Sequence, residues 1–413
     1  MRIVFTTFCL YAISCSVALA AESWSQFRGD GGNGEAKSAE LPTHWSEKEN
    51  IRWKTAIEGK SWSSPVVRGG KVWMTSATPD GKKLSAVCVD AATGKIQLDI
   101  TVFEIEKPMF CISYNSYASC TPVIDDDHLW VHFGSAGTAC LYSSNGDIIW
   151  IRQDLPCDHH RGPGSSPIIQ GDGLFLTFDG FDQQYVVALN KRNGETIWRT
   201  DRDIDYGSDN GDVKKAYSTP TYINHQGRQQ LISPASVATI AYDPGSGREL
   251  WKVYHGGFNA AAKPLYTHDL VILNLQGGLR LLAVRPDGEG DVTDTKIVWK
   301  YKKSTPTRPS QLVVGDHLFM MNDKGIFSCL DVRTGLLSWT ERVGGGHSAS
   351  PIYANGLIYC FDERGMTYVL KADPTSYKLV AQNELENGCM ASPAVIGNAL
   401  IVRTKTHLYR IEN

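Results

Sequence analysis

The chain has 413 residues, of which 42% are hydrophobic, and a formal net charge of −3. That length would suit two or three ordinary domains, but a repeat fold can absorb it in one domain. There is no excess of basic residues and no polybasic run, so the composition argues against binding to nucleic acid and against a peripheral membrane anchor.

The first residues predict export. Arg2 is followed by an apolar stretch from Ile3 to Leu19, and Ala18-Leu19-Ala20 supplies the small residues of a cleavage site. We interpret residues 1–20 as a secretory signal peptide, so the mature protein is expected to be periplasmic or secreted. Cys15 offers a minor alternative, a lipid anchor, although the residues before it match that signal poorly. No later stretch is apolar for long enough to span a membrane as a helix.

A lead-in segment, residues 21–50, precedes a repeated unit. Each unit begins with a residue followed by Pro, continues with apolar residues and a Gly or Asp turn, and ends in a second apolar strand. Eight copies begin at Ser64-Pro65, Thr121-Pro122, Ser166-Pro167, Thr219-Pro220, Lys263-Pro264, Arg308-Pro309, Ser350-Pro351 and Ser392-Pro393. A repeat of about 40–50 residues that contains four short strands is typical of one β-propeller blade.

The second half of each unit contains a third strand, a Gly turn and a fourth strand that often carries Trp. Gly accepts the positive φ that such hairpin turns require. Six Trp residues share this phase: Trp53, Trp150, Trp198, Trp251, Trp299 and Trp339. The shared phase favours a structural role, in which each Trp locks its blade to the neighbouring blade, over a stacking platform for a flat cofactor.

The last copy predicts how the ring closes. Residues 408–411 supply its third strand, and no fourth strand follows before Asn413. Ile51-Arg52-Trp53-Lys54, before the first copy, has the pattern of the missing outer strand. Pairing these two segments would remove the open sheet edges. The sequence therefore predicts an all-β fold, an eight-bladed β-propeller of four-stranded blades that spans residues 51–413 and is closed by the N- and C-terminal strands.

This pattern, Ala/Cys-x-Asp followed by Thr-Gly and then Trp, resembles the pyrroloquinoline-quinone (PQQ) repeat. The family includes quinoprotein alcohol dehydrogenases and the outer-membrane assembly scaffold BamB. The lead-in motifs, Trp24 to Gly29 and Leu41 to Trp45, look like those of exported PQQ-like propellers. In the dehydrogenases, a disulfide between adjacent cysteines lies beside the quinone, and no two cysteines are adjacent here.

Eight cysteines follow the predicted cleavage site. Cys88, Cys140 and Cys329 align with Ala in other copies, which predicts small, buried, free thiols. Cys111 and Cys120 lie close enough in sequence to form a disulfide.

Two groups of residues raise the question of a metal. His159 and His160 are neighbours, but adjacent side chains on an extended chain point to opposite sides, and no metal-ligand spacing supports them. The acidic residues Asp287, Glu289, Asp291 and Asp294 are better explained by a solvated hairpin than by a calcium site. No metal site is expected.

The residues just before each Pro are expected to line one mouth of the central channel, because the strand that follows is innermost in the related propellers. Together with loops after the second strands, they predict a ligand-binding site formed by Trp62, Asn115, Tyr117, His160, Arg161, Asp179, Lys215, Lys263, Arg308 and Arg403. The cations would attract an anionic group, such as a carboxylate or an acidic sugar, although Asp179 and Asp182 would offset them. Ordinary loop polarity is the alternative explanation.

Three functions remain open. The first is a non-catalytic binding or scaffold propeller in the cell envelope, with a protein or glycan partner, no catalytic residues and no cofactor. The second is a PQQ-dependent dehydrogenase, which would need a calcium-bound quinone and a carboxylate base. The third is a carbohydrate hydrolase or lyase that uses His159 or His160 together with Asp179. A shared fold supports none of them by itself.

Overall fold

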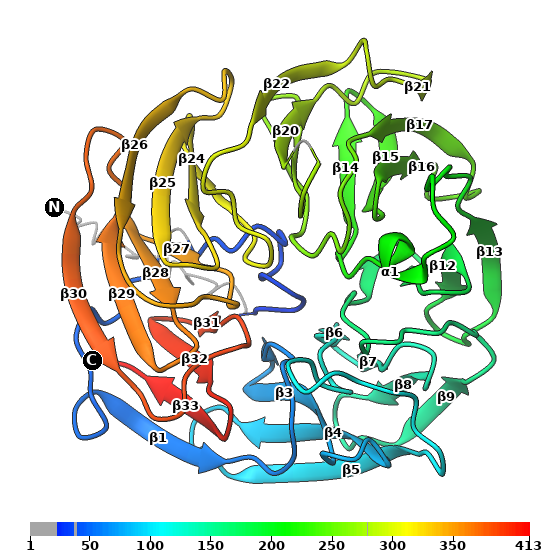
Figure 1. Ribbon diagram of the computed structural model, residues 1–413. Coiled ribbons are helices and arrows are strands. Elements are labelled where there is room, and N and C mark those ends of the chain that lie inside the picture. The colour runs from blue at the N-terminus through cyan, green and yellow to red at the C-terminus, as the bar shows by residue number, and fades with distance from the viewer. Residues whose placement is uncertain (1–22, 37–38, 279) are drawn as a thin grey trace, which may run out of the picture.

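The computed structural model describes residues 23–36, 39–278 and 280–413. The predicted signal peptide and Cys15 lie outside these residues. Eight sheets are arranged in a ring, as the sequence predicts, and their strands are antiparallel except for one short parallel pair (Figure 1). The described residues contain a single short helix, α1 (Gly211–Lys214), and no helix among them is long and apolar enough to cross a membrane.

The first four blades follow the order of the chain, from the innermost strand outward. Blade 1 contains β2 (Val66–Arg68), β3 (Lys71–Ala77), β4 (Lys83–Asp90) and β5 (Ile96–Glu104). Blade 2 contains β6 (Val123–Ile124), β7 (His128–His132), β8 (Thr138–Tyr142) and β9 (Ile148–Arg152). Blade 3 contains β10 (Ile168–Gln170), β11 (Gly173–Asp179), β12 (Gln184–Asn190) and β13 (Thr196–Asp201). Blade 4 contains β14 (Thr221–His225), β15 (Arg228–Pro234), β16 (Ala238–Tyr242) and β17 (Glu249–Tyr254).

The remaining blades complete the ring. Blade 5 contains β18 (Leu265–Thr267), β19 (Leu270–Asn274), β20 (Leu281–Val284) and β22 (Ile297–Tyr301). Blade 6 contains β23 (Leu312–Val314), β24 (His317–Met321), β25 (Ile326–Asp331) and β26 (Leu337–Arg342). Blade 7 contains β27 (Ile352–Ala354), β28 (Leu357–Phe361), β29 (Met366–Lys371) and β30 (Leu379–Glu384). Blade 8 contains β31 (Ala394–Ile396), β32 (Ala399–Arg403), β33 (His407–Ile411) and β1 (Ile51–Ala56).

The two ends of the chain meet in blade 8. β1 pairs antiparallel with β33, with Trp53 opposite Arg410 and Ala56 opposite His407. The outer strand of the last blade therefore comes from the start of the repeat region, which confirms the predicted closure.

The repeated Trp residues join neighbouring blades. The Nε1 atoms of Trp53, Trp198 and Trp299 donate to the carbonyl oxygens of Ala91, Pro244 and Val332, at 2.9–3.0 Å, in the next blade. The indole ring of each also packs against a Gly of the turn that follows the third strand there. The predicted structural role, in which a Trp locks its blade to the neighbouring blade, is therefore confirmed for these three residues. Trp251 differs, because its Nε1 donates to Gln230 Oε1 within its own blade.

The start of blade 6 is two residues later than the sequence predicts. Leu312 begins β23, and in every other blade the innermost strand begins two residues after the residue that precedes Pro. Ser310 thus takes the position assigned to Arg308, and Gln311 takes the position of Pro. Pro309 lies two residues before the position that Pro takes in the other copies. The spacing of Pro residues alone therefore placed the start of this copy too early.

The acidic residues Asp287, Glu289, Asp291 and Asp294 are exposed, as the sequence predicts, and Gly290–Asp291 forms β21, which pairs in parallel with β17 of blade 4. All eight cysteines between Cys88 and Cys389 are free thiols, so Cys111 and Cys120 are not joined. Cys140 and Cys329 lie opposite the Trp of the next strand, as Ala188 does, which explains why a small residue is needed there.

Candidate functional site

A cavity of about 340 Å³ lies where the innermost strands begin. Segments distant in sequence line it because eight inner strands start around one axis. The lining residues used below are the aromatic residues Phe27, Trp62, Tyr114 and Tyr217, the cations Arg161 and Arg308, and a set of Ser and Thr side chains. Among the described residues that line the cavity, none is Asp or Glu.

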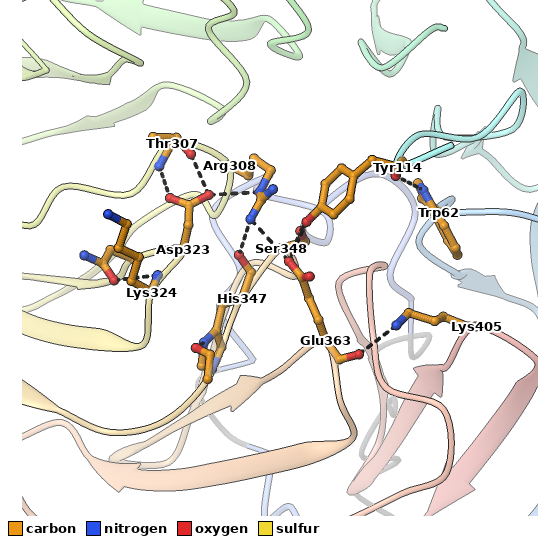
Figure 2. Close-up of polar contacts among 12 residues, drawn as sticks. Trp62, Tyr114, Thr307, Arg308, Asp323, Lys324, His347, Ser348, Glu363 and Lys405 are labelled. Carbon is orange, nitrogen blue, oxygen red and sulfur yellow. Dashed lines mark hydrogen bonds and ion pairs between the residues drawn. The ribbon is translucent and has the colours of Figure 1, made fainter. Parts of the chain in front are cut away.

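The connection between blades 1 and 2 reaches across the mouth. Its Tyr114 contacts blade 7, where the phenol hydroxyl donates to Glu363 Oε1 at 2.6 Å and lies 2.9 Å from Ser348 Oγ. Trp62 Nε1 holds the same segment by donating to the Tyr114 carbonyl at 2.9 Å (Figure 2). Burial and the bond to Glu363 raise the pKa of Tyr114 to about 12, so the phenol stays protonated.

Arg308 lies beside Tyr114 and is fixed by two carboxylates. Its Nε lies 2.9 Å from Asp323 Oδ1, and its Nη2 lies 3.2 Å from Glu363 Oε1 (Figure 2). The guanidinium carbon also lies 4.8 Å from the centre of the Tyr114 ring. Glu363 therefore joins the Arg308 cation, the Tyr114 phenol and the Ser348 hydroxyl, which donates to it at 2.7 Å.

Arg161, the other cation of the lining, is held in a similar way. Its Nη2 donates to Asp212 Oδ2 at 2.7 Å. Asp212 lies in the first turn of α1, where Asn210 caps the helix by accepting from the Asp212 amide. The Asn115 side chain donates to the carbonyl oxygens of Arg161 and Pro163, at 2.9 and 3.0 Å, and so shapes this wall of the cavity.

The lead-in segment contacts several blades and contributes to the cavity, a role that the sequence did not reveal. Trp24 exchanges backbone hydrogen bonds with Val67 in blade 1, and Ala36 donates to the Tyr353 carbonyl in blade 7. Between them, Arg28 is buried and donates to the Gln311 carbonyl at 2.7 Å. Phe27 thereby lines the cavity from the lead-in segment, which crosses the centre of the ring (Figure 1).

Four of the ten predicted site residues line this cavity: Trp62, Asn115, Arg161 and Arg308. Tyr117 instead lines a second, smaller cavity of about 210 Å³. The His160 ring lies outside the main lining and stacks on Phe181, with ring centres 4.1 Å apart.

The other four predicted residues are buried within or between blades. Asp179 forms a two-bond ion pair with Arg202. Lys215 Nζ lies 3.0 Å from His159 Nδ1, and Lys263 Nζ donates to the Pro220 carbonyl at 3.0 Å. Arg403 is 1% exposed, and its guanidinium nitrogens have no hydrogen-bond partner among the described residues. The sequence places all four near the axis, but the direction of each side chain depends on strand twist and depth.

In the part of the chain that the structure describes, no group of three or more His, Cys, Asp or Glu residues could hold a metal ion. His159 is buried, and its Nε2 accepts from the Ser135 amide at 3.1 Å. Burial, with the Lys215 charge, keeps the pKa of His159 well below its usual value, so the ring is neutral.

The fold is a repeat propeller with a cavity where the innermost strands begin. A family described as outer membrane protein assembly factor BamB matches residues 47–229 and 182–413, and the chain belongs to this family of PQQ-like repeat propellers. No curated protein matches the sequence at a significant level.

Solved structures share the architecture at low sequence identity. BamB from Moraxella catarrhalis is 12% identical, with a TM-score of 0.63, and the match covers 88% of this chain and 97% of that one. A europium-containing methanol dehydrogenase is 10% identical, with a TM-score of 0.66 and coverage of 94% and 90%. The quinohemoprotein alcohol dehydrogenase from Comamonas testosteroni is 9% identical, with a TM-score of 0.66 and coverage of 94% and 80%. At these identities the likeness establishes the fold alone.

Proposed function

We propose that the protein is a non-catalytic binding propeller of the cell envelope, which takes an anionic ligand, or an anionic group of a protein or glycan partner, in the cavity at the channel mouth. Export is proposed from the predicted signal peptide at residues 1–20. The observation that carries the binding proposal is the charge of the described lining, where Arg161 and Arg308 are the charged side chains. Their carboxylate partners stand outside the lining, so a ligand would meet the arginines first.

A PQQ-dependent dehydrogenase fits these residues poorly. A calcium-bound quinone needs carboxylate or amide oxygens for the ion and a carboxylate base for the substrate. The described lining contains the amides of Asn115, Asn259 and Gln276 but no carboxylate to act as the base, and Asp323 and Glu363 are bound to Arg308. We therefore expect no PQQ cofactor.

A hydrolase or lyase at this mouth is also disfavoured. Its acid and base would have to converge on one substrate. Asp179 is bound to Arg202, and His160 is stacked on Phe181 outside the cavity.

Binding of small anions to the purified protein tests the proposal. Thermal-shift and calorimetric titrations would compare glucuronate, benzoate, glucose, and PQQ with calcium, using the unmodified chain and Arg161→Ala and Arg308→Ala variants. We expect at least one carboxylate to bind, and each substitution to weaken it about 10-fold or more, since charge-assisted hydrogen bonds contribute about 1.5–3 kcal/mol.

Arg199→Ala is the matched control, because Arg199 is also paired with a carboxylate but lies on outer strand β13. The Arg199→Ala variant should bind the carboxylate with the same affinity as the unmodified chain. Stoichiometric PQQ binding followed by alcohol oxidation would favour the dehydrogenase, and binding that survives both cavity substitutions would refute the assignment of the site.

A further inference from the structure

A ring of side-chain hydroxyls surrounds the axis at the start of the inner strands. The backbone N–H of one blade donates to the hydroxyl oxygen of the next blade, at 2.9–3.0 Å, at seven places around the ring. The accepting residues are Thr121, Ser166, Thr219, Ser310, Ser350, Ser392 and Ser64. The ring is interrupted between blades 4 and 5, where Lys263 stands at the corresponding position.

Each hydroxyl in this ring accepts a hydrogen bond but does not donate one within the described part of the protein. A Ser or Thr hydroxyl has one O–H donor as well as its acceptor lone pairs. All seven oxygens accept a backbone N–H, but none of the seven O–H groups donates to an acceptor among the described residues. The ring therefore presents hydrogen-bond donors that its own blades leave unused.

Six of the seven hydroxyl residues face the cavity. Ser64, Thr121, Ser166, Thr219, Ser350 and Ser392 belong to its lining, and Ser310 does not. The donors thus surround the same space that Arg161 and Arg308 border. A ligand that satisfies both features needs several acceptor oxygens spread around a compact body, together with one negative group.

The walls add a third requirement. Trp62, Tyr217 and Phe27 bring aromatic surface to the cavity, which favours a ligand with an apolar face. A volume of about 340 Å³ lies within the range of small-molecule sites, which is about 300–1,000 Å³.

We propose that the ligand is an acidic monosaccharide of the hexuronate type, with its carboxylate at Arg161 and Arg308 and its ring oxygens at the hydroxyl ring. This inference rests on the proposed function and names the ligand class for the same cavity. A sugar ring combines acceptor oxygens on its edge with C–H faces that pack on aromatic rings. A simple carboxylate would satisfy the arginines and leave the hydroxyl donors unused.

Calorimetric titration of the full purified chain with glucuronate, galacturonate, glucose and benzoate tests the inference. We expect at least one uronate to bind more tightly than both glucose, which lacks the charge, and benzoate, which lacks the hydroxyls. Ser166→Ala and Ser350→Ala should each weaken that uronate about 3- to 10-fold, the usual effect of one lost hydrogen bond. Benzoate affinity should change less than 2-fold.

Ser310→Ala supplies a matched control. It removes the same kind of structural hydrogen bond, from the Lys263 amide, but at a hydroxyl outside the cavity lining. Its melting temperature should fall as much as that of Ser350→Ala, while its uronate affinity stays unchanged. Ser166→Thr keeps the hydroxyl, as Thr121 and Thr219 do, and should restore binding if Ser166→Ala weakens it.

The outcomes separate this inference from the proposed function. If benzoate binds as tightly as the uronates and the serine variants leave affinity unchanged, the hydroxyl ring is only structural and the ligand is a simple anion. If no probe binds, both the ligand class and the binding function at this cavity are wrong. Equal losses of uronate affinity in Ser310→Ala and Ser350→Ala would also overturn the inference.

Discussion

Cationic side chains near the cavity differ in exposure: some are partly exposed and paired with a carboxylate, and others are buried. Arg161 and Arg308 are about one-third exposed and paired with carboxylates, so they remain available at the cavity surface. Arg28, Lys263 and Arg403 are buried, and burial lowers their pKa values to about 9, 7 and 10. The first pair is suited to ligand binding, whereas the buried group reduces stability when charged.

The burial of Lys263 is expected to make the unfolding free energy depend on pH. Burial, with a smaller contribution from Arg28, lowers its pKa to about 7, whereas an unfolded lysine has a pKa of about 10.4. Between these values the unfolded chain binds more protons, so stability rises with pH; below pH 7 both states are protonated and the contribution is constant. From about pH 6.5 to about pH 8.5, the unfolding free energy of the unmodified chain should gain about 1–2 kcal/mol relative to Lys263→Met.

Urea unfolding of both proteins at several pH values provides the measurement. Comparing the two cancels the contributions of the buried thiols, whose raised pKa values act in the opposite direction at alkaline pH. Parallel pH curves for the two proteins would show that Lys263 does not titrate in this range.

The contact between one blade's Trp and the next blade's Gly turn joins neighbouring blades, and two glycines allow its contribution to stability to be measured separately. Gly335 has a φ of +70°, and an added Cβ would lie 2.6 Å from the Trp299 ring. Gly315 has a φ of +59°, with no atom within 4 Å of such a Cβ. Gly315→Ala should therefore cost about 1–2 kcal/mol from backbone strain alone, and Gly335→Ala about 1–3 kcal/mol more from overpacking against Trp299. Equal unfolding midpoints for the two variants would contradict this interlocking role.

Elements that follow the repeat could be predicted from the sequence, and elements that break it could not. The regular spacing of Pro, Gly and Trp predicted the eight blades, the contacts of Trp between blades and the pairing of β1 with β33. It failed at Ser310, where Pro309 stands two residues early. It also carried no information about Tyr114 or Phe27, because the connection between blades 1 and 2 and the lead-in segment have no counterpart in other blades. Tyr114 is held at the site by Glu363, which is 249 positions away, and the lead-in segment is held there by the contact of Arg28 with Gln311, which is 283 positions away.

For the molecule as a whole, stability depends on closing the ring, and β1 is the strand that closes it. Residues 51–57 supply the outer strand of blade 8 and the Trp53 contact with blade 1. Their deletion would leave β33 as an open sheet edge and expose the surface that Trp53 covers. Loss of one buried Trp alone costs about 3–5 kcal/mol, which corresponds to a fall in melting temperature of about 4–7 °C for a domain of this size, and the lost strand pairing adds to it.

Thermal unfolding followed by circular dichroism would measure that loss, with size-exclusion chromatography to detect association through the open edge. A synthetic peptide of residues 45–57, added to the deletion variant, should recover part of the melting temperature because it can pair with β33. A deletion variant that melts within about 2 °C of the full chain would mean that blade 8 is stable as three strands. Closure by β1 would then be dispensable, and the blade contacts made by the other Trp residues would have to hold the ring together.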